Sequence, residues 1–262
     1  MTPNLDLSTV SPSRQTYKSM SSKYVVMDTE KLANYLLGLT SKGEPIFELR
    51  QIINSRSKVA GKGKHIVRLR TIKSYQIDKD TLFPEIVIMN SHDGSCPLRV
   101  EMGVFRLVCT NGLVVKSRDL GEIKIRHMGT AEEAAFQIIT QFAANAPKFV
   151  QAQKQLAERV LNGDEIIDFA KRAAEIRWNR EFSADDAKVL LTVERPEDEG
   201  NTMWTVMNRV QEKLMTGGVK LSGQKRFAKK ITNAGEDVRI NSELFELASS
   251  YCPSSYCEYE MV

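Results

Sequence analysis

The 262-residue chain is poor in cysteine and in aromatic residues, with four Cys and 7% Phe, Trp and Tyr. No stretch approaches the roughly 18 consecutive apolar residues that a membrane-spanning helix needs, and residues 1–23 lack the apolar core of a secretory signal. We therefore expect a cytoplasmic protein with free thiols and no membrane partner.

Recognisable catalytic and cofactor motifs are also missing. There is no phosphate-binding P-loop, no dinucleotide-binding glycine fingerprint and no hydrolase nucleophile elbow. His92, Cys96, Cys109 and His127 match no zinc-ligand spacing, and we expect the two cysteines of the C-terminal tail neither to pair nor to bind a metal. We accordingly predict no metal, no cofactor and no catalytic residue, and favour a binding protein over an enzyme.

The segment NSHDGSC, residues 90–96, combines side chains that often carry chemistry. Apolar strand patterns flank it, and Asp-Gly is a common way to make a tight turn, so we predict a turn at Asp93-Gly94. Two alternatives stay open. The loop could contact a ligand through His92, or His92, Asp93 and His127 could serve general acid–base chemistry in a hydrolase.

The N-terminal half predicts a mostly antiparallel sheet that follows one helix capped by Asp28 or Thr29. Its strands are expected where apolar residues alternate or run together, at residues 45–53, 65–75, 85–90, 98–109, 113–115 and 122–127.

The C-terminal half has helical periodicity from residue 130 onward. Pro147 is expected to break or kink the first helix, and Ser183 with Asp186 forms a capping box for a later one. Further helices are predicted over 164–178 and 202–215, the second ended by Gly217-Gly218, and a last one is expected to start at Asn241.

These patterns predict an α+β protein, with an antiparallel sheet packed against a helical C-terminal half. We expect a poorly ordered extension (1–23), one domain (24–250) and an irregular tail (251–262). Within the domain, residues 24–129 would be rich in strands and residues 130–250 helical.

Two runs of the chain, residues 51–77 and 213–235, carry several cations and no Asp or Glu. A phosphate backbone is the natural partner of such runs, because each neutralised phosphate releases condensed counterions. A solvated basic face and an acidic protein partner are the alternatives, and the few aromatic residues weaken a base-stacking interpretation. The predicted nucleic-acid-binding residues are Arg56, Lys58, Lys62, Lys64, Arg68, Arg70, Lys225, Arg226, Lys229 and Lys230.

Three longer stretches resemble a known family. They are MNSHDGSCPLRVEMGVFRLVCTNGLVV (89–115), TMWTVMNRVQEKLMTGG (202–218) and DVRINSELFELA (237–248). Together they resemble the phage/plasmid-like protein family called domain of unknown function 932. The resemblance spans residues 24–250 and implies a gene carried by phages, prophages or plasmids, but it implies no reaction.

Within the second stretch, Asn208, Gln211 and Glu212 share one face of the predicted helix. They could hydrogen-bond to backbone where sheet and helices meet, or contact a ligand near the second basic run.

The first hypothesis is therefore a phage- or plasmid-encoded nucleic-acid-binding protein of the host-cell cytoplasm. It would bind or anneal single-stranded DNA in recombination or replication, and whether it forms a homo-oligomer stays open. The alternative is an interaction protein that inhibits a host defence or restriction system.

Overall fold

The computed structural model describes residues 5–12, 20–54, 63–106, 113–115, 123–232 and 234–252. The chain divides into two compact units, and each draws on three stretches of sequence. The first, here called the sheet unit, comprises residues 1–75, 83–105 and 118–147. The second, the helical unit, comprises residues 76–82, 106–117 and 148–262. We expected one domain that changes character at residue 130, whereas these units interleave along the chain.

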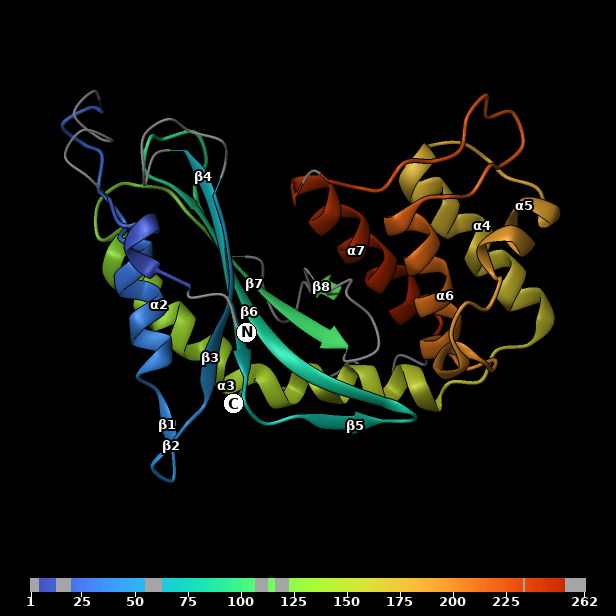
Figure 1. Cartoon of the computed structure of the whole chain (residues 1–262), viewed down its shortest axis with the longest axis horizontal. Helices are drawn as coiled ribbons and strands as arrows, with labels where there is room; N and C mark the ends of the chain where they lie inside the picture. The colour runs from blue at the N-terminus through green and yellow to red at the C-terminus, as the bar shows by residue number, and fades with distance from the viewer. Residues whose placement is uncertain are drawn as a thin grey trace. The chain divides into compact units, whose positions relative to one another are not determined.

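Antiparallel strands occupy the N-terminal half and helices the C-terminal half (Figure 1), so the predicted α+β class is confirmed. The main sheet has the order β3–β4–β6–β7–β8, with β5 paired to β6 and β9 paired to β7. Its strands are β3 (Phe47–Asn54), β4 (Lys64–Thr71), β5 (Tyr75–Ile77), β6 (Asp80–Ser91), β7 (Leu98–Arg106), β8 (Leu113–Val115) and β9 (Ile123–Ile125). The short strands β1 (Thr40–Ser41) and β2 (Glu44–Pro45) pair with each other.

Strand β6 lies at the core of the sheet unit because its sequence is an almost continuous apolar run. Ile86, Val87 and Ile88 are at most 1% exposed, as expected for a strand covered on both faces. Helix α2 (Thr29–Leu37) packs on β3 and β4 and buries Leu32 and Leu36. Asp28 caps α2 by accepting hydrogen bonds from the backbone of its first turn, as predicted.

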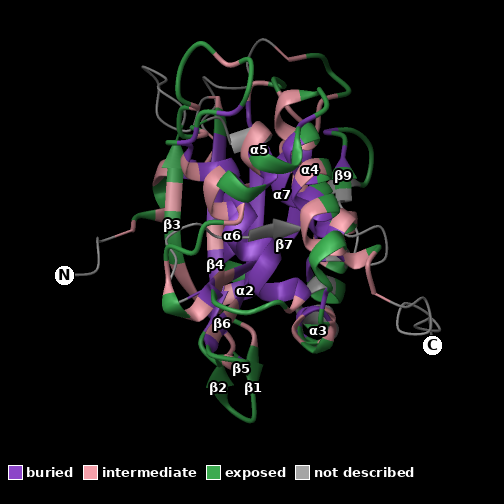
Figure 2. Ribbon diagram, turned by 90° about the vertical axis from the view of Figure 1, so that its right-hand side faces the viewer, coloured by how far each residue is buried: buried purple, intermediate pink, exposed green. Residues whose placement is uncertain are grey.

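Helix α6 (Met203–Thr216) lies at the centre of the helical unit. Every residue from 203 to 211 is buried (Figure 2), and α4, α5 and α7 pack around it. Thr202 caps its N-terminus, and Gly217 ends it with φ of 73°. The unit's other helices are the C-terminal part of α3 (Ala131–Glu158), α4 (Gly163–Trp178), α5 (Ala184–Leu190), η2 (Pro196–Asp198) and α7 (Ala234–Ser249). The predicted capping box of Ser183 and Asp186 opens α5.

Part of the expected N-terminal extension is folded. Residues Leu7–Val10 form a 3-10 turn, η1, whose N-cap is Asp6, and Val10 is fully buried. The Ser11 hydroxyl also donates to the Glu30 carboxylate of α2. Only Val10 of this short segment is buried, and so short a stretch gives no clear periodic signal, which explains why the sequence did not indicate this turn.

Two predicted helix boundaries are wrong. Helix α3 continues through Pro147, so the helix does not break there, while the kink given as the other outcome stays a prediction. Helix α7 begins at Ala234 rather than at Asn241, whose buried amide donates to the Asp237 carbonyl within the helix at 3.0 Å. Asn can cap a helix, but inside one it can also bond the carbonyl four residues back, and the sequence does not distinguish the two. The end of the strand predicted over 98–109 (residues 107–109) and tail residues 253–262 lie outside the described residues.

Candidate functional site

The first basic run is only partly described. Arg56, Lys58 and Lys62 lie outside the described residues, while Lys64 is exposed at the start of β4. Arg68 and Arg70 follow on the same strand, and their environment differs from the predicted one.

Arg68 and Arg70 share the carboxylate of Glu85 on the neighbouring strand. The antiparallel register places Arg70 opposite Glu85, and Arg70 Nε donates to Glu85 Oε1 at 2.8 Å. Arg68 Nη1 lies 3.4 Å from Glu85 Oε2. The Arg70 guanidinium also covers the Phe105 ring, with its central carbon 3.3 Å from the ring centroid. Strand pairing thus supplies an acid that is absent from residues 51–77, and phosphate contact by Arg68 and Arg70 stays a prediction.

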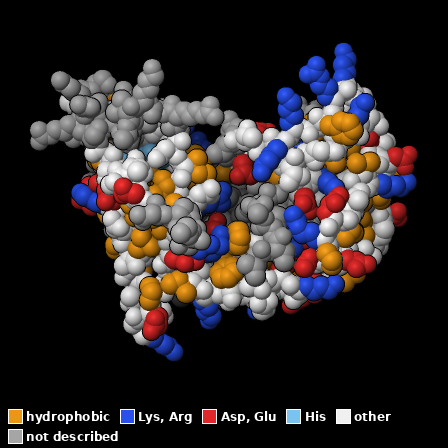
Figure 3. All heavy atoms as spheres, in the orientation of Figure 1, with side chains coloured by type: hydrophobic (Ala, Val, Ile, Leu, Met, Phe, Trp, Pro, Cys, Tyr) orange, Lys and Arg blue, Asp and Glu red, His pale blue; other side chains and the backbone are white. Residues whose placement is uncertain are grey.

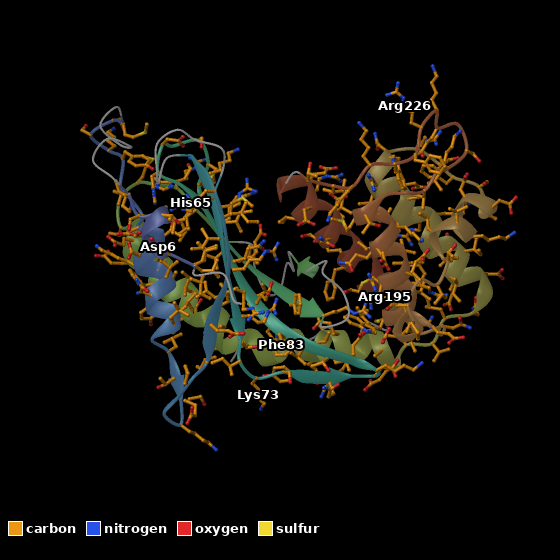
Figure 4. The ribbon with its side chains drawn as sticks, viewed as in Figure 1. Asp6, His65, Lys73, Phe83, Arg195 and Arg226 are labelled. Atoms are coloured by element: carbon orange, nitrogen blue, oxygen red, sulfur yellow. The ribbon has the colours of Figure 1, made fainter. Side chains whose placement is uncertain are left out.

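The second basic run forms a loop between α6 and α7, which we call the basic finger (residues 217–231). Figure 3 shows Lys and Arg side chains gathered where this loop lies, and Figure 4 shows Arg226 pointing away from the fold. The finger's cations are all exposed, and none of them makes a salt bridge among the residues that the structure describes. They are Lys220, Lys225, Arg226, Lys229 and Lys230.

Backbone hydrogen bonds hold the two sides of the finger together. Gly218 N–H donates to Ala228 O at 2.9 Å, and Ala228 N–H donates to Val219 O at 2.8 Å. Farther along, Ile231 N–H donates to Met215 O at 2.9 Å. Val219 itself is buried, so the finger has an apolar base. The cations are thus carried on a fixed backbone.

Side chains of α4 and α5 clamp the finger from the helical core. Arg177 donates to the carbonyls of Leu214 and Lys229, so one guanidinium joins both sides of the finger's base. Asp186 Oδ1 accepts from Ser222 N–H at 2.7 Å. Burial raises the pKa of Asp186, but hydrogen bonds from Ser222 and Ser183 outweigh that effect and bring the pKa to about 2. This clamp therefore stays charged at any ordinary pH.

Replacing Gly217 with alanine is expected to distort the finger. A Cβ at this position would lie 2.4 Å from Ala228 O, and φ is 73°. With ψ of −140° this backbone conformation is one that essentially only glycine adopts, and it costs an alanine about 1–3 kcal/mol. The clash adds roughly 1–3 kcal/mol because backbone must move. Gly218→Ala is a matched control, because φ there is 76° but nothing lies within 4 Å of the added Cβ. Equal losses in urea unfolding for the two variants would contradict this account.

An aromatic side chain stands among the finger's cations. Phe227 is 65% exposed, the largest exposed fraction of the large hydrophobic side chains that the structure describes. A ring in water beside several unpaired cations can stack on a flat π-system while the cations contact phosphates. The sequence showed Phe227 within the basic run, but only the structure shows that the fold leaves it uncovered.

His92, a predicted ligand-contact residue, is fully buried. Its Nε2 lies 3.1 Å from Met27 O. The predicted turn is confirmed, because Gly94 has φ of 71° and Asp93 Oδ1 accepts from Ser95 N–H at 3.0 Å. His92 therefore does not face an exterior ligand.

The chain's three histidines come together in the sheet unit. The rings of His65 and His92 lie 4.8 Å apart between centroids, and His127 stacks on Tyr24 at 4.8 Å. Burial, followed by the neighbouring His92, lowers the pKa of His65 to about 4. Burial likewise lowers the pKa of His127. No set of three His, Cys, Asp or Glu residues within the described ranges is arranged to hold a metal ion.

The polar face of α6 has partners inside the helical unit. Gln211 Nε2 donates to Asn241 Oδ1 at 2.7 Å, and Glu212 accepts both Nη groups of Arg195 at 2.6 and 2.8 Å. These partners are side chains, not the backbone carbonyls or exterior ligand that the sequence suggested. Asn208 is 2% exposed, and within the described part of the chain neither polar atom of its amide has a hydrogen-bond partner.

A buried charge cluster that the sequence did not indicate lies in the helical unit. The Arg106 guanidinium, 2% exposed, donates to Asp80 Oδ1 at 2.8 Å and to Asp198 Oδ1 at 2.7 Å. The indole N–H of Trp204 donates to Asp80 Oδ2 at 2.7 Å. These four residues come from distant parts of the sequence and carry no common motif, so only tertiary structure identifies the cluster.

Comparison with models of protein families shows which family the chain belongs to. The model for the domain of unknown function DUF932 matches residues 16–244. The chain belongs to the DUF932 family. The match includes the basic finger, the three histidines and the Arg106 cluster, so each feature lies within the family's domain.

Two curated proteins of Escherichia coli strain K12 are similar to this DUF932 chain. UPF0380 protein YfjQ is 29% identical over 195 residues, which cover 71% of this chain and 68% of YfjQ. UPF0380 protein YafZ is 28% identical over 246 residues, which cover 91% of this chain and 86% of YafZ. No solved structure matches significantly. None of the described helices combines the length and apolar character needed to cross a membrane.

Proposed function

We propose that this DUF932 protein binds nucleic acid, with single-stranded DNA as its preferred partner, through the basic finger. The observation that supports this proposal most directly is the combination of unpaired cations and the exposed Phe227 on one clamped loop. The biological setting that we propose is recombination or replication of a phage or plasmid in the host cytoplasm, where the protein would bind or anneal strands.

Electrostatics would supply most of the affinity. Lys225, Arg226, Lys229 and Lys230 are exposed, and no acidic side chain pairs with them among the described residues. Such cations replace counterions condensed on the phosphate backbone, and the entropy of the released ions drives binding. The net charge of the whole chain is only +4, so a local concentration of charge is what supports the proposal.

The fixed shape of the finger would favour binding as well. Ordering a flexible basic loop on its ligand would cost conformational entropy. Here Arg177 and Asp186 already hold the loop's base through its backbone. The cationic side chains remain mobile on this fixed support. Such mobility suits a nucleic-acid backbone, which is recognised by its charge rather than by its sequence.

Phe227 gives the proposal its preference for single strands. In a duplex the bases are stacked and paired, so an exposed ring has no accessible base face. In a single strand each base offers a face, and base–aromatic stacking contributes about 1–3 kcal/mol per base.

Replacing Phe227 with alanine is expected to weaken binding to a single-stranded oligonucleotide about 5- to 150-fold, the loss that corresponds to one stacked base. Duplex affinity should change by less than about twofold, because the finger's charge is unaltered. Fluorescence anisotropy with a labelled 30-nucleotide single strand and the matching duplex measures both quantities. Phe227→Trp serves as the control and should keep the affinity for the single strand. Equal losses for single strand and duplex would rule out stacking by Phe227.

A further inference from the structure

The three buried histidines share one structural task, which goes beyond the proposed function and does not depend on it. Each contacts a different position of residues 24–29, the segment that leads into α2. We call this segment the strap. His127 Nδ1 lies 3.1 Å from Val25 O, and His92 Nε2 lies 3.1 Å from Met27 O. His65 Nε2 lies 2.8 Å from Thr29 Oγ1.

The strap is contacted through both its backbone and a side chain. His127 and His92 meet the carbonyl groups of Val25 and Met27, and His65 meets the hydroxyl of Thr29, the first residue of α2. The Val25 amide also donates back to His127 O at 2.9 Å, which makes the contact with His127 reciprocal. Asn90 Nδ2 adds 2.9 Å contacts to Met27 O and Thr29 Oγ1.

The hydrogen-bond directions around His65 require a neutral ring. Its Nδ1 lies 3.2 Å from Gly63 O, which can only accept, so Nδ1 carries the proton. Nε2 must then accept from the Thr29 hydroxyl. That hydroxyl in turn accepts from Asn90 Nδ2, which completes a one-way chain. Protonation of His65 would place a second donor against Thr29 and reverse the last bond of the chain.

A charge on one ring would also act on the others. His65 is 2% exposed and His92 is fully buried, and their centroids lie 4.8 Å apart. Two imidazolium ions at this distance with little water between them repel each other strongly.

We propose that the histidine cluster is an acid-sensitive latch, which holds the strap on the sheet while the buried His65 is neutral and releases it when His65 is protonated next to His92. Opening of the strap would detach the N-terminal end of α2 from the sheet unit and leave the helical unit folded. The latch is thus a conformational device at the N-terminus of the domain.

Other ionisable groups also face the cluster. Asp93, from the β6–β7 turn, acts on His65 in the opposite direction and favours its charged form. Burial raises the pKa of Tyr24, on the strap itself, to about 12, so Tyr24 stays neutral. Cys96 meets His127 through its backbone. The remaining charged side chains on the flanking elements are Asp28, Glu30, Lys64 and Arg126.

The sign of the pH effect follows from the lowered pKa of His65. A group whose pKa is lower in the closed state stabilises that state above its ordinary pKa and loses this contribution as pH falls. For His65 this contribution to the closed state is therefore lost as the pH falls from about 6.5 to about 4. If His65 recovers its ordinary pKa when the strap opens, the opening equilibrium should rise about 30-fold between pH 7.5 and pH 5.0.

Hydrogen–deuterium exchange of the full chain tests the latch, with rates corrected for the intrinsic effect of pH. Peptides covering residues 24–37 should lose about 30-fold of their protection between pH 7.5 and pH 5.0, while peptides of α6 keep theirs. Unchanged protection of the strap would overturn the proposal. Parallel loss of protection in α6 would overturn it too, because the transition would then be global unfolding.

His65→Gln supplies the second arm of the test. Glutamine can still accept from Thr29 but cannot be protonated in this range, so the pH dependence should fall to about threefold or less. Full wild-type pH dependence in this variant would exclude His65 as the trigger. The wild-type measurement decides the existence of the latch even if the variant fails to fold.

Discussion

Replacing Arg106 with alanine is expected to lower the free energy of unfolding of the helical unit by about 3–5 kcal/mol, because two buried carboxylates lose their countercharge. Asp80 and Asp198 are each 1% exposed and meet at the Arg106 guanidinium. Without that cation they would repel each other in a site that water does not reach. The contact of Asp80 with the Trp204 indole offsets only a small part of this loss.

Urea unfolding followed by tryptophan fluorescence measures this effect. The chain has two tryptophans, Trp178 and Trp204, and both belong to the helical unit, so the signal reports on that unit alone. Arg172→Ala is the control. It removes an arginine whose ion pair with Asp168 is about half exposed on both sides, and such pairs contribute at most about 1 kcal/mol. A loss below about 1 kcal/mol for Arg106→Ala would contradict the assigned role.

A variant that removes the whole charge cluster separates repulsion from lost packing. Arg106→Met combined with Asp80→Asn and Asp198→Asn leaves no buried charge, and replacement of a buried ion cluster by neutral groups is often tolerated. This triple variant is expected to be more stable than Arg106→Ala, and the reverse order would show that shape rather than charge determines the loss.

The second large effect is expected on DNA binding, when four of the finger's cations are removed. If Lys225, Arg226, Lys229 and Lys230 are all changed to glutamine, binding to single-stranded DNA should weaken on the order of 10²- to 10³-fold at 0.1 M salt. Each phosphate contact on a single strand contributes about 0.7 to the slope of log K against log salt. Four contacts therefore contribute about 2.8, which is the change in slope to be measured by anisotropy across a salt series.

The matched control changes the same number of charges elsewhere. Exposed lysines at positions 23, 42, 79 and 154, changed to glutamine, give the same net charge without altering the finger. The control should keep a slope close to that of the unaltered protein. A similar loss in both variants would indicate that net charge, and not the finger, determines binding.

Local sequence signals predicted most elements of the fold correctly. Asp28 caps α2, Ser183 with Asp186 opens α5, and Gly217 ends α6. Capping groups and positive-φ glycines act within four or five residues, so their effect can be read from the chain alone. The boundaries that were wrong involve tertiary context, since α3 continues through Pro147.

The candidate site was predictable in part, because some of its signals are also local in the sequence. The sequence indicated the cations of the basic finger, because a run of lysines without acids is a local pattern. It did not show that Arg68 and Arg70 are paired, because their partner Glu85 arrives through strand pairing. The histidine latch and the Arg106 cluster could not be foreseen, since their members lie far apart in sequence and meet only in the fold.

The most direct test of the proposed function is the salt dependence of binding by the unaltered protein to a labelled 30-nucleotide single strand. Contact of Lys225, Arg226, Lys229 and Lys230 with phosphates predicts a log–log slope of about −3 or steeper. Stacking by Phe227 further predicts tighter binding to the single strand than to the matching duplex. A slope near zero, or no binding at low salt, would contradict the assignment of this protein as a nucleic-acid-binding protein.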